Sequence, residues 1–161
     1  MAIFYNGLLY AHEILHRRVR EQGGAYGGGA IYDPFAGAFK FFSYRDPRFI
    51  ETFEDFSESF KWATKGDFDD EMILEAKLSV LSDIDKPASP AGEAFKDYRF
   101  NVEEKSQKIR SQYRKKIINA SREEIIEAAE QLKGQPNSCF SIINPNLEKK
   151  ASEEGFQIRR I

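Results

Sequence analysis

His12, Glu13 and His16 form the pattern H-E-x-x-H, with which a helix can hold a catalytic zinc ion. Residues four apart share one face of a helix, so the two imidazoles could chelate one ion while Glu13 serves as general base for a bound water. Such a site needs a third protein ligand, and the chain has two histidines in total. The remaining possible ligands, Glu51, Glu54 and Glu58 of the next predicted helix, lie in no recognisable motif.

The surroundings of this motif favour a chance match over a metal site. His12 falls in the apolar stripe of Leu8, Leu15 and Val19, where a histidine is ordinarily packed among its neighbours. Arginines follow at positions 17, 18 and 20, and their positive charges oppose the binding of a dication. We therefore predict no metal ligand in this chain. A self-sufficient small zinc peptidase is the alternative, and metal analysis of the purified chain distinguishes the two hypotheses.

The motif lies on a predicted helix that leads into a predicted hairpin. Apolar residues at helical spacing predict a helix from about 6 to 20, ended by Gly23-Gly24. Two β-rich runs around Asp33-Pro34 and Gly37 then predict a hairpin. The glycine-rich stretch therefore joins a helix to a strand.

Aromatic residues dominate the predicted core. The sequence has 14 phenylalanines and 7 tyrosines among 161 residues, which implies a thick aromatic core or a groove lined with rings. In the second β-rich run, Phe39 and Phe41 point to one face, and Phe42 and Tyr44 point to the other. We expect both faces to be covered.

The segment after the hairpin predicts a helix with an aromatic face. Asp46 is placed as its N-cap and Pro47 in its first turn, and Gly66 ends it. Arg45 and Asp46 are expected to cap and brace this helix. Its inward stripe consists of Phe49, Phe53, Phe56 and Phe60.

The rest of the chain predicts three more helices and two short strands. A third helix starts near Asp69 and carries Ile73, Ala76, Val80 and Leu81. A proline-rich loop at 83–93, a helix at about 102–118, a helix opened by the Ser121–Glu124 capping box, and strands at 137–145 and 155–161 follow. Strands and helices do not alternate as in parallel α/β units. The predicted class is α+β, an antiparallel sheet packed against several helices, with residues 1–161 as a single domain.

The charge balance and the single cysteine limit the function classes. Lysine and arginine total 24 against 26 acidic residues, which suggests neither a nucleic-acid surface nor a membrane surface. Cys139 excludes an internal disulfide and lies among strand-forming residues, so we expect it to be buried. We expect a soluble intracellular protein, cytoplasmic in a bacterium and mitochondrial or in another organelle in a eukaryote.

The glycine-rich stretch carries a resemblance to a known family. "LHRRVREQGGAYGGGAIYDPFAGAFKFFSYRDP", residues 15–47, closely resembles the C-terminal region of the presequence-protease family of pitrilysin-type metallopeptidases. The likeness continues through "IETFEDFSESFKWATKGDF" and "EAKLSVLSDIDKP", and "FQIRRI" is similar to the family's terminal strand. It covers about nine-tenths of the chain. The spacing arginine-(x5)-tyrosine within G-G-A-Y-G-G is more specific than H-E-x-x-H.

The resemblance implies that the catalytic zinc lies outside this chain. In the family the ion is held by an inverted H-x-x-E-H motif in the N-terminal half, and no such motif exists here. The C-terminal half supplies an arginine and a tyrosine to the substrate, and these match Arg20 and Tyr26. The histidine that matches His16 is not a metal ligand in the family. The H-E-x-x-H pattern is then a coincidence.

The resemblance also implies a role for each matched residue. A phenol hydroxyl from Tyr26 would stabilise the oxyanion formed during peptide hydrolysis, and Arg20 would hold nearby substrate carbonyls. The glycines would let an extended peptide approach the backbone; they are Gly23, Gly24, Gly27, Gly28 and Gly29. The expected partners are peptide substrates and the N-terminal half of the same enzyme.

Three origins of so short a chain stay open: an excised fragment, one piece of a cleaved protein, or a naturally split subunit. The likeness also suggests that the chain lacks the first elements of its domain. The chain alone is expected to be inactive. Besides the small zinc peptidase, a non-catalytic module for peptide holding or subunit assembly remains an alternative, which peptide binding without hydrolysis would favour.

Overall fold

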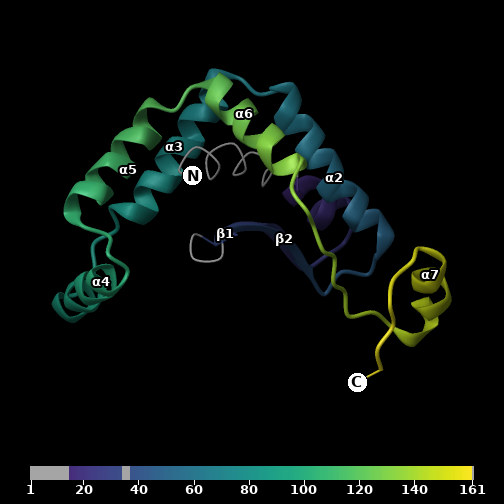
Figure 1. Ribbon diagram of the computed structural model, residues 1–161. Coiled ribbons are helices and arrows are strands. Elements are labelled where there is room, and N and C mark those ends of the chain that lie inside the picture. Colours follow the sequence, from purple (N-terminus) through teal and green to yellow (C-terminus); the bar gives the residue numbers. More distant parts are fainter. Residues whose placement is uncertain (1–14, 34–36, 161) are drawn as a thin grey trace.

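A computed structural model describes residues 15–33 and 37–160, except for the side chain of Asp83. The helices follow one another in an arch, with α4 at one end and α7 at the other, and a hairpin lies beneath the arch (Figure 1). The elements are η1 (His16–Gln22), β1 (Gly27–Asp33), β2 (Ala38–Tyr44), α2 (Ile50–Lys65), α3 (Asp70–Ile84), α4 (Pro90–Val102), α5 (Gln107–Asn119), α6 (Arg122–Lys133), η2 (Pro145–Leu147) and α7 (Glu148–Glu153). This small antiparallel sheet with several helices confirms the predicted α+β class.

The hairpin packs one face on α2 and leaves the other face partly exposed. Strands β1 and β2 pair antiparallel, with Gly27 opposite Tyr44 and Asp33 opposite Ala38. On the inner face the Phe41 ring stacks on Phe56, with centroids 5.0 Å apart. On the outer face Phe42 and Tyr44 are 39% and 50% exposed. The expectation that both faces are covered is therefore wrong for the described residues, because their helices pack on one side of the hairpin.

The start of α2 differs from the prediction, whereas its end agrees. Asp46 is not the N-cap; the capping position is Phe49, which has no side-chain capping bond. Asp46 instead accepts hydrogen bonds from the Arg48 N–H at 3.0 Å and from the Thr52 hydroxyl at 2.8 Å. Asp46 therefore stabilises the segment that leads into α2, three residues before the capping position Phe49. Gly66 ends α2 in the left-handed region at φ 70°, as predicted, where a side chain would be strained.

Helices α3 and α6 begin where the sequence predicted, near Asp69 and at the Ser121–Glu124 capping box. The Asp69 carboxylate accepts a hydrogen bond from the Met72 N–H at 2.8 Å, and both bonds of the Ser121–Glu124 capping box are present. These two helices share a core of Phe68, Ile73, Ala76 and Ile125. A second cluster joins α3 to α5 through Val80 and Ile117.

The structure adds a helix that the sequence analysis missed. Residues 90–102 form α4, although the proline-rich loop was expected to reach residue 93. The missed signal was Ser89-Pro90: the Ser89 hydroxyl accepts from the Gly92 N–H, and Pro90 occupies the first turn, a common helix start. Helix α5 accordingly begins at Gln107 rather than near 102.

The two late strands are absent from the part of the chain that the structure describes. Residues 137–144 belong to no helix or strand, and Phe140 and Ile142 are 84% and 76% exposed. Residues 156–160 also form no strand. Cys139 is exposed, so its predicted burial is wrong as well. A β-prone segment becomes a strand only when another strand satisfies its backbone groups, and within residues 15–33 and 37–160 no partner strand pairs with it.

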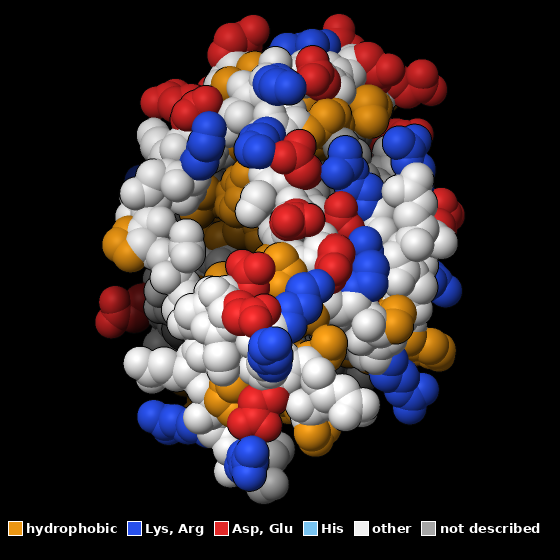
Figure 2. All heavy atoms as spheres, turned by 90° about the vertical axis from the view of Figure 1, so that its right-hand side faces the viewer, with side chains coloured by type: hydrophobic (Ala, Val, Ile, Leu, Met, Phe, Trp, Pro, Cys, Tyr) orange, Lys and Arg blue, Asp and Glu red, His pale blue; other side chains and the backbone are white. Residues whose placement is uncertain are grey.

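The surface mixes charges of both signs. Figure 2 shows basic and acidic side chains interspersed over one face, with apolar side chains between them. This agrees with the near balance of 24 basic and 26 acidic residues. Among the described residues, no helix has the length and apolar character needed to cross a bilayer.

An ion pair ties α7 to the first turn of α2. The Lys150 ammonium lies 2.7 Å from Glu51 Oε1, and Phe156 packs on Phe49 with ring centroids 5.2 Å apart. The hydrogen bond from Lys150, together with backbone N–H groups at the start of α2, lowers the pKa of Glu51 to about 2. The ionised carboxylate is therefore favoured in the folded state.

This ion pair predicts a small pH-dependent contribution to stability. Because the folded-state pKa of Glu51 is lowered, its contribution is fully present above about pH 4.5 and is lost as the pH falls towards about 2. The Glu51→Gln substitution should lower the free energy of unfolding by less than about 1 kcal/mol at neutral pH, since the pair is half exposed. Urea unfolding of both proteins between about pH 2 and pH 7 measures the difference. Glu54→Gln, at an exposed carboxylate of the same helix, is the control. A Glu51→Gln deficit that stays constant down to pH 2 would contradict the assignment.

Candidate functional site

Arg20 lies on the π-helix η1, and one side of this helix packs against the hairpin. Val19 and Leu15 are fully buried and pack with Ala25 against Phe39 and Phe41. Arg20, the neighbour of Val19, is exposed. Its guanidinium lies 3.1 Å from His16 Nε2. π-Helical turns are rare in proteins, and many of those known lie at functional sites.

The glycine turn carries the chain from η1 to the strand. The N–H of Gly24 donates to the Arg20 carbonyl at 3.0 Å, and the N–H of Ala25 donates to the Val19 carbonyl at 3.1 Å. Gly24 has φ +79°, a conformation that L-residues rarely adopt. These bonds fix how the chain leaves the helix that carries Arg20 and reaches Tyr26.

Tyr26 projects from the start of the hairpin into solvent. It is 62% exposed, and its N–H donates to the Arg45 carbonyl at 3.3 Å. The Tyr44 ring lies 5.4 Å from the Tyr26 ring, and the Arg45 guanidinium lies 5.3 Å from the Tyr26 ring centroid. The ring is thus supported from two sides while the residue stays exposed. An exposed phenol in a supported ring can donate a hydrogen bond to an incoming oxygen atom.

Arg45 and Tyr44 were not assigned to the site by the sequence. Arg45 was expected to brace α2, yet it stacks on Tyr26 and has φ 49°, a strained value for a residue with a side chain. Such strain persists where surrounding contacts hold it, and it clusters at functional sites. The signal that could have found both residues is the β-hairpin register, which brings Tyr44 beside Gly27.

Three of the glycines face side chains of the chain itself. A methyl group on Gly23 would meet the Arg48 guanidinium, and one on Gly27 would meet the Tyr44 ring. A methyl on Gly28 would lie 3.0 Å from Val19 Cγ1. Their small size therefore lets Arg48, Tyr44 and η1 come close to the turn. Contact of these glycines and of Gly24 with substrate stays a prediction.

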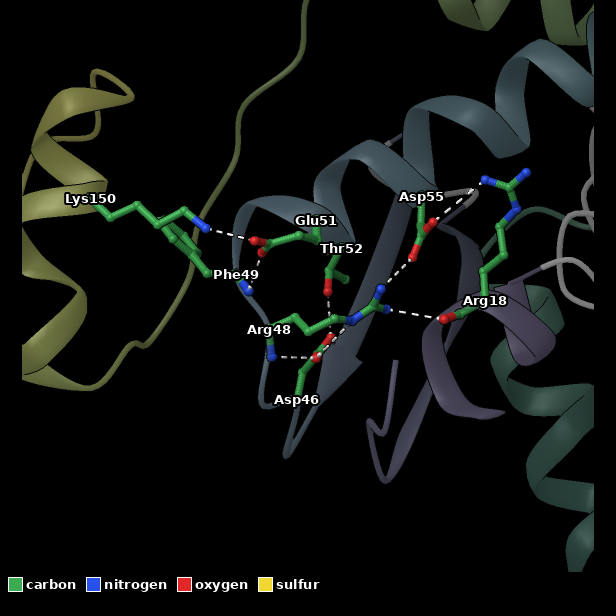
Figure 3. A network of polar contacts seen from close by, with 8 residues as sticks. All are labelled: Arg18, Asp46, Arg48, Phe49, Glu51, Thr52, Asp55 and Lys150. Atoms are coloured by element: carbon green, nitrogen blue, oxygen red, sulfur yellow. Dashed lines mark hydrogen bonds and ion pairs between the residues drawn. The ribbon is translucent and has the colours of Figure 1, made fainter. Parts of the chain in front are cut away.

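A network of polar contacts holds η1 against α2 (Figure 3). The Arg48 guanidinium donates to the Arg18 carbonyl at 3.1 Å and lies 3.0 Å from Asp55 Oδ2. The Arg18 guanidinium lies 3.6 Å from the other oxygen of Asp55. Asp46, whose side chain is 8% exposed, flanks Arg48 from the opposite side.

The described residues do not form a metal site. No group of three or more His, Cys, Asp and Glu side chains is arranged to hold an ion within residues 15–33 and 37–160. His16 lies next to Arg20 and, through Nδ1, 3.6 Å from a Glu21 oxygen. His12 and Glu13 lie outside the described residues, so the chance origin of the H-E-x-x-H pattern stays a prediction.

The fold and this site define an α+β chain in which a helix, a glycine turn and a hairpin place Arg20 and Tyr26 at the surface. A family model described as the PreP C-terminal domain matches residues 7–149. The mitochondrial presequence protease of Saccharomyces cerevisiae is 32% identical over 168 residues, which cover 100% of this chain and 16% of that protein. The Mus musculus protein of the same name is 32% identical over 94% of this chain, and the Yarrowia lipolytica protein is 34% identical over 87%.

The chain belongs to the PreP C-terminal domain family. This confirms the resemblance drawn from residues 15–47. The chain spans 14–16% of the length of these relatives, which are peptidases by name. The assignment of residues 1–161 to a single domain stays a prediction.

Proposed function

We propose that this chain is the C-terminal part of a zinc-dependent metalloendopeptidase that degrades short unstructured peptides, such as cleaved targeting presequences. The observation that carries the proposal is the exposed pair of Arg20 and Tyr26 on either side of the glycine turn, within a chain of the presequence-protease family. In a eukaryote the protein would work in the mitochondrion, as its named relatives do, and in a bacterium in the cytoplasm.

The two side chains divide the work by their chemistry. The Arg20 guanidinium carries five N–H donors, which suit carbonyl oxygens of an extended peptide. The Tyr26 hydroxyl is a single donor that can turn towards the oxygen that gains negative charge as the peptide carbonyl is attacked. The Tyr44 ring and the Arg45 guanidinium limit where the Tyr26 ring can go. These contacts restrict the orientation of the Tyr26 ring before substrate binds.

Zinc, when bound by the N-terminal half, would polarise the peptide carbonyl and activate the attacking water. The described part of this chain offers no ligand set for it. This chain would then contribute substrate contacts, and the other half would contribute the ion.

A comparison of the full-length protein with the isolated chain tests whether zinc and substrate contacts come from different halves. The full-length protein should hydrolyse an unstructured peptide, lose that activity on treatment with a chelator, and regain it with zinc. The 161-residue chain alone should bind no stoichiometric zinc and hydrolyse nothing. Elemental analysis and peptide turnover measure both.

Two outcomes would contradict the proposal. Stoichiometric zinc on the isolated chain that disappears in a His16→Ala variant would favour the small self-sufficient peptidase. Peptide binding without hydrolysis by the zinc-loaded full-length protein would favour the non-catalytic module. Glu75→Ala, at an exposed acidic residue of α3, is the matched control for the metal analysis.

A further inference from the structure

Arg48 is the centre of the network that joins η1, the glycine turn and α2 (Figure 3). It lies 30 residues after Arg18 in the sequence, yet its Nη2 donates to the Arg18 carbonyl at 3.1 Å. Its Nη1 lies 3.0 Å from Asp55 on α2. The Arg48 and Asp55 side chains are only 26% and 14% exposed, so water competes weakly for these contacts. The Arg48 guanidinium thus links η1, through a hydrogen bond to the Arg18 carbonyl, to α2, through the ion pair with Asp55.

The approach of Arg48 depends on Gly23. The space that a methyl group on Gly23 would occupy is filled by the Arg48 guanidinium, with Nη2 and Cζ nearest. The guanidinium therefore lies directly on the turn that links Arg20 to Tyr26. A methyl there would push the guanidinium away from Asp55 and from the Arg18 carbonyl, because those contacts require its present position.

Two further contacts hold Arg48 in place. Asp46 Oδ1 accepts from the Arg48 backbone N–H at 3.0 Å and lies 4.0 Å from its Nε. Asp46 Oδ2 is in turn held by the Thr52 hydroxyl at 2.8 Å, and Thr52 is 4% exposed. Backbone and side chain of Arg48 are therefore both anchored to the start of α2. Such anchoring leaves the guanidinium few alternative positions.

We propose that Arg48, seated on Gly23 and held by Asp55 and Asp46, is a positioning residue that sets the relative placement of Arg20 and Tyr26. The inference rests on the proposed function for its effect on turnover. It also predicts an effect on the turn itself that needs no activity. Arg48 acts through the helix end and the turn, and its side chain does not touch substrate.

The test compares Arg48→Met with Arg48→Lys in the full-length protein. Arg48→Met keeps the length of the side chain and removes every donor, so kcat/KM should fall by about tenfold, because small misplacements of catalytic groups are costly. Arg48→Lys keeps the charge beside Asp55 but lacks the fork that reaches the Arg18 carbonyl at the same time, so its kcat/KM should lie in between. Arg114→Met removes an equally direct arginine–carboxylate pair on α5, with Asp85, and should leave turnover unchanged.

The Gly23→Ala variant provides a second test of the positioning role of Arg48. Alone, it should lower kcat/KM as Arg48→Met does, because the methyl displaces the guanidinium. Combined with Arg48→Met, it should add less than about twofold, since the displaced group is already gone. Fully additive losses would overturn the proposal, because the two residues would then act independently.

Hydrogen exchange gives the readout that is independent of activity. In Arg48→Met, the amides of Gly24 and Ala25 should exchange at least about tenfold faster, whereas the amide of Ile125 in α6 should not change. Unchanged exchange at Gly24 and Ala25, or faster exchange everywhere, would overturn the positioning role. If exchange is faster only at the turn while Tyr26→Phe leaves turnover intact, the role assigned to Tyr26 fails, and the catalytic purpose assigned to Arg48 fails with it. If the zinc-loaded full-length protein hydrolyses no peptide, the proposed function fails, whereas faster exchange at the turn still supports the structural effect of Arg48.

Discussion

Replacing Tyr26 with phenylalanine in the full-length protein is expected to lower kcat for peptide hydrolysis by about 100-fold, the usual effect of losing one oxyanion donor. The change removes a single hydroxyl group and keeps the ring that contacts Tyr44 and Arg45. KM should change little, because the hydroxyl is proposed to act on charge that develops only in the transition state. Steady-state kinetics on an unstructured peptide measure both constants.

The control for this experiment is Tyr98→Phe. Tyr98 lies on α4 and is 67% exposed, close to the 62% of Tyr26, so the two substitutions remove equally accessible hydroxyl groups. Tyr98→Phe should leave kcat unchanged. Equal kcat values for Tyr26→Phe and the unmodified protein would refute the role assigned to Tyr26. A rise in KM alone would instead make Tyr26 a substrate-binding residue.

Replacing Phe41 with alanine is expected to destabilise the chain by about 2 kcal/mol, less than the loss for a fully buried aromatic residue because Phe41 is half-buried. The Phe41 ring stacks on Phe56 and meets Phe39 and Phe60 edge-on, with centroids 4.9–5.0 Å apart. A two-stranded hairpin is marginal by itself, so β1 and β2 depend on this packing against α2. Urea unfolding of the 161-residue chain, followed by circular dichroism, measures the loss.

The neighbouring residue supplies the control. Phe42 is the next residue of the same strand, points to the other face and is 39% exposed. Phe42→Ala should therefore cost less than about 1 kcal/mol, as exposed substitutions usually do. Equal losses from the two substitutions would mean that both faces of the hairpin are covered in solution, contrary to the structure.

Signals that act over a few residues predicted the local structure well. Asp69 and the Ser121–Glu124 pair each bond to a backbone N–H three residues on, so the sequence spacing alone specifies the contact. Gly66 ends α2 because a residue without a side chain adopts the left-handed turn. The same reasoning failed at Ser89-Pro90 because proline is frequent both in loops and in the first turn of helices.

Longer-range contacts decided most of the candidate site. Arg20 and Tyr26 came from a family resemblance, and their exposure is compatible with the roles it implies. Nothing local indicated that Arg48 would sit on Gly23, because that contact joins residues separated by the whole hairpin. Asp46 likewise bonds to Thr52 instead of capping α2, since the chain bends before the helix begins.

The sequence by itself determined the α+β class, the C-terminal end of α2, the starts of α3 and α6, and the alternation of the aromatic residues in β2. These features depend on backbone preferences and hydrogen bonds between residues a few positions apart. Only the tertiary structure decided which face of the hairpin is covered, and it leaves the β-prone residues 137–144 unpaired. It also brought Lys150 to Glu51, across 99 residues, and Arg48 to Arg18. Burial and strand pairing require a second surface, and local residue patterns do not specify which surface will be there.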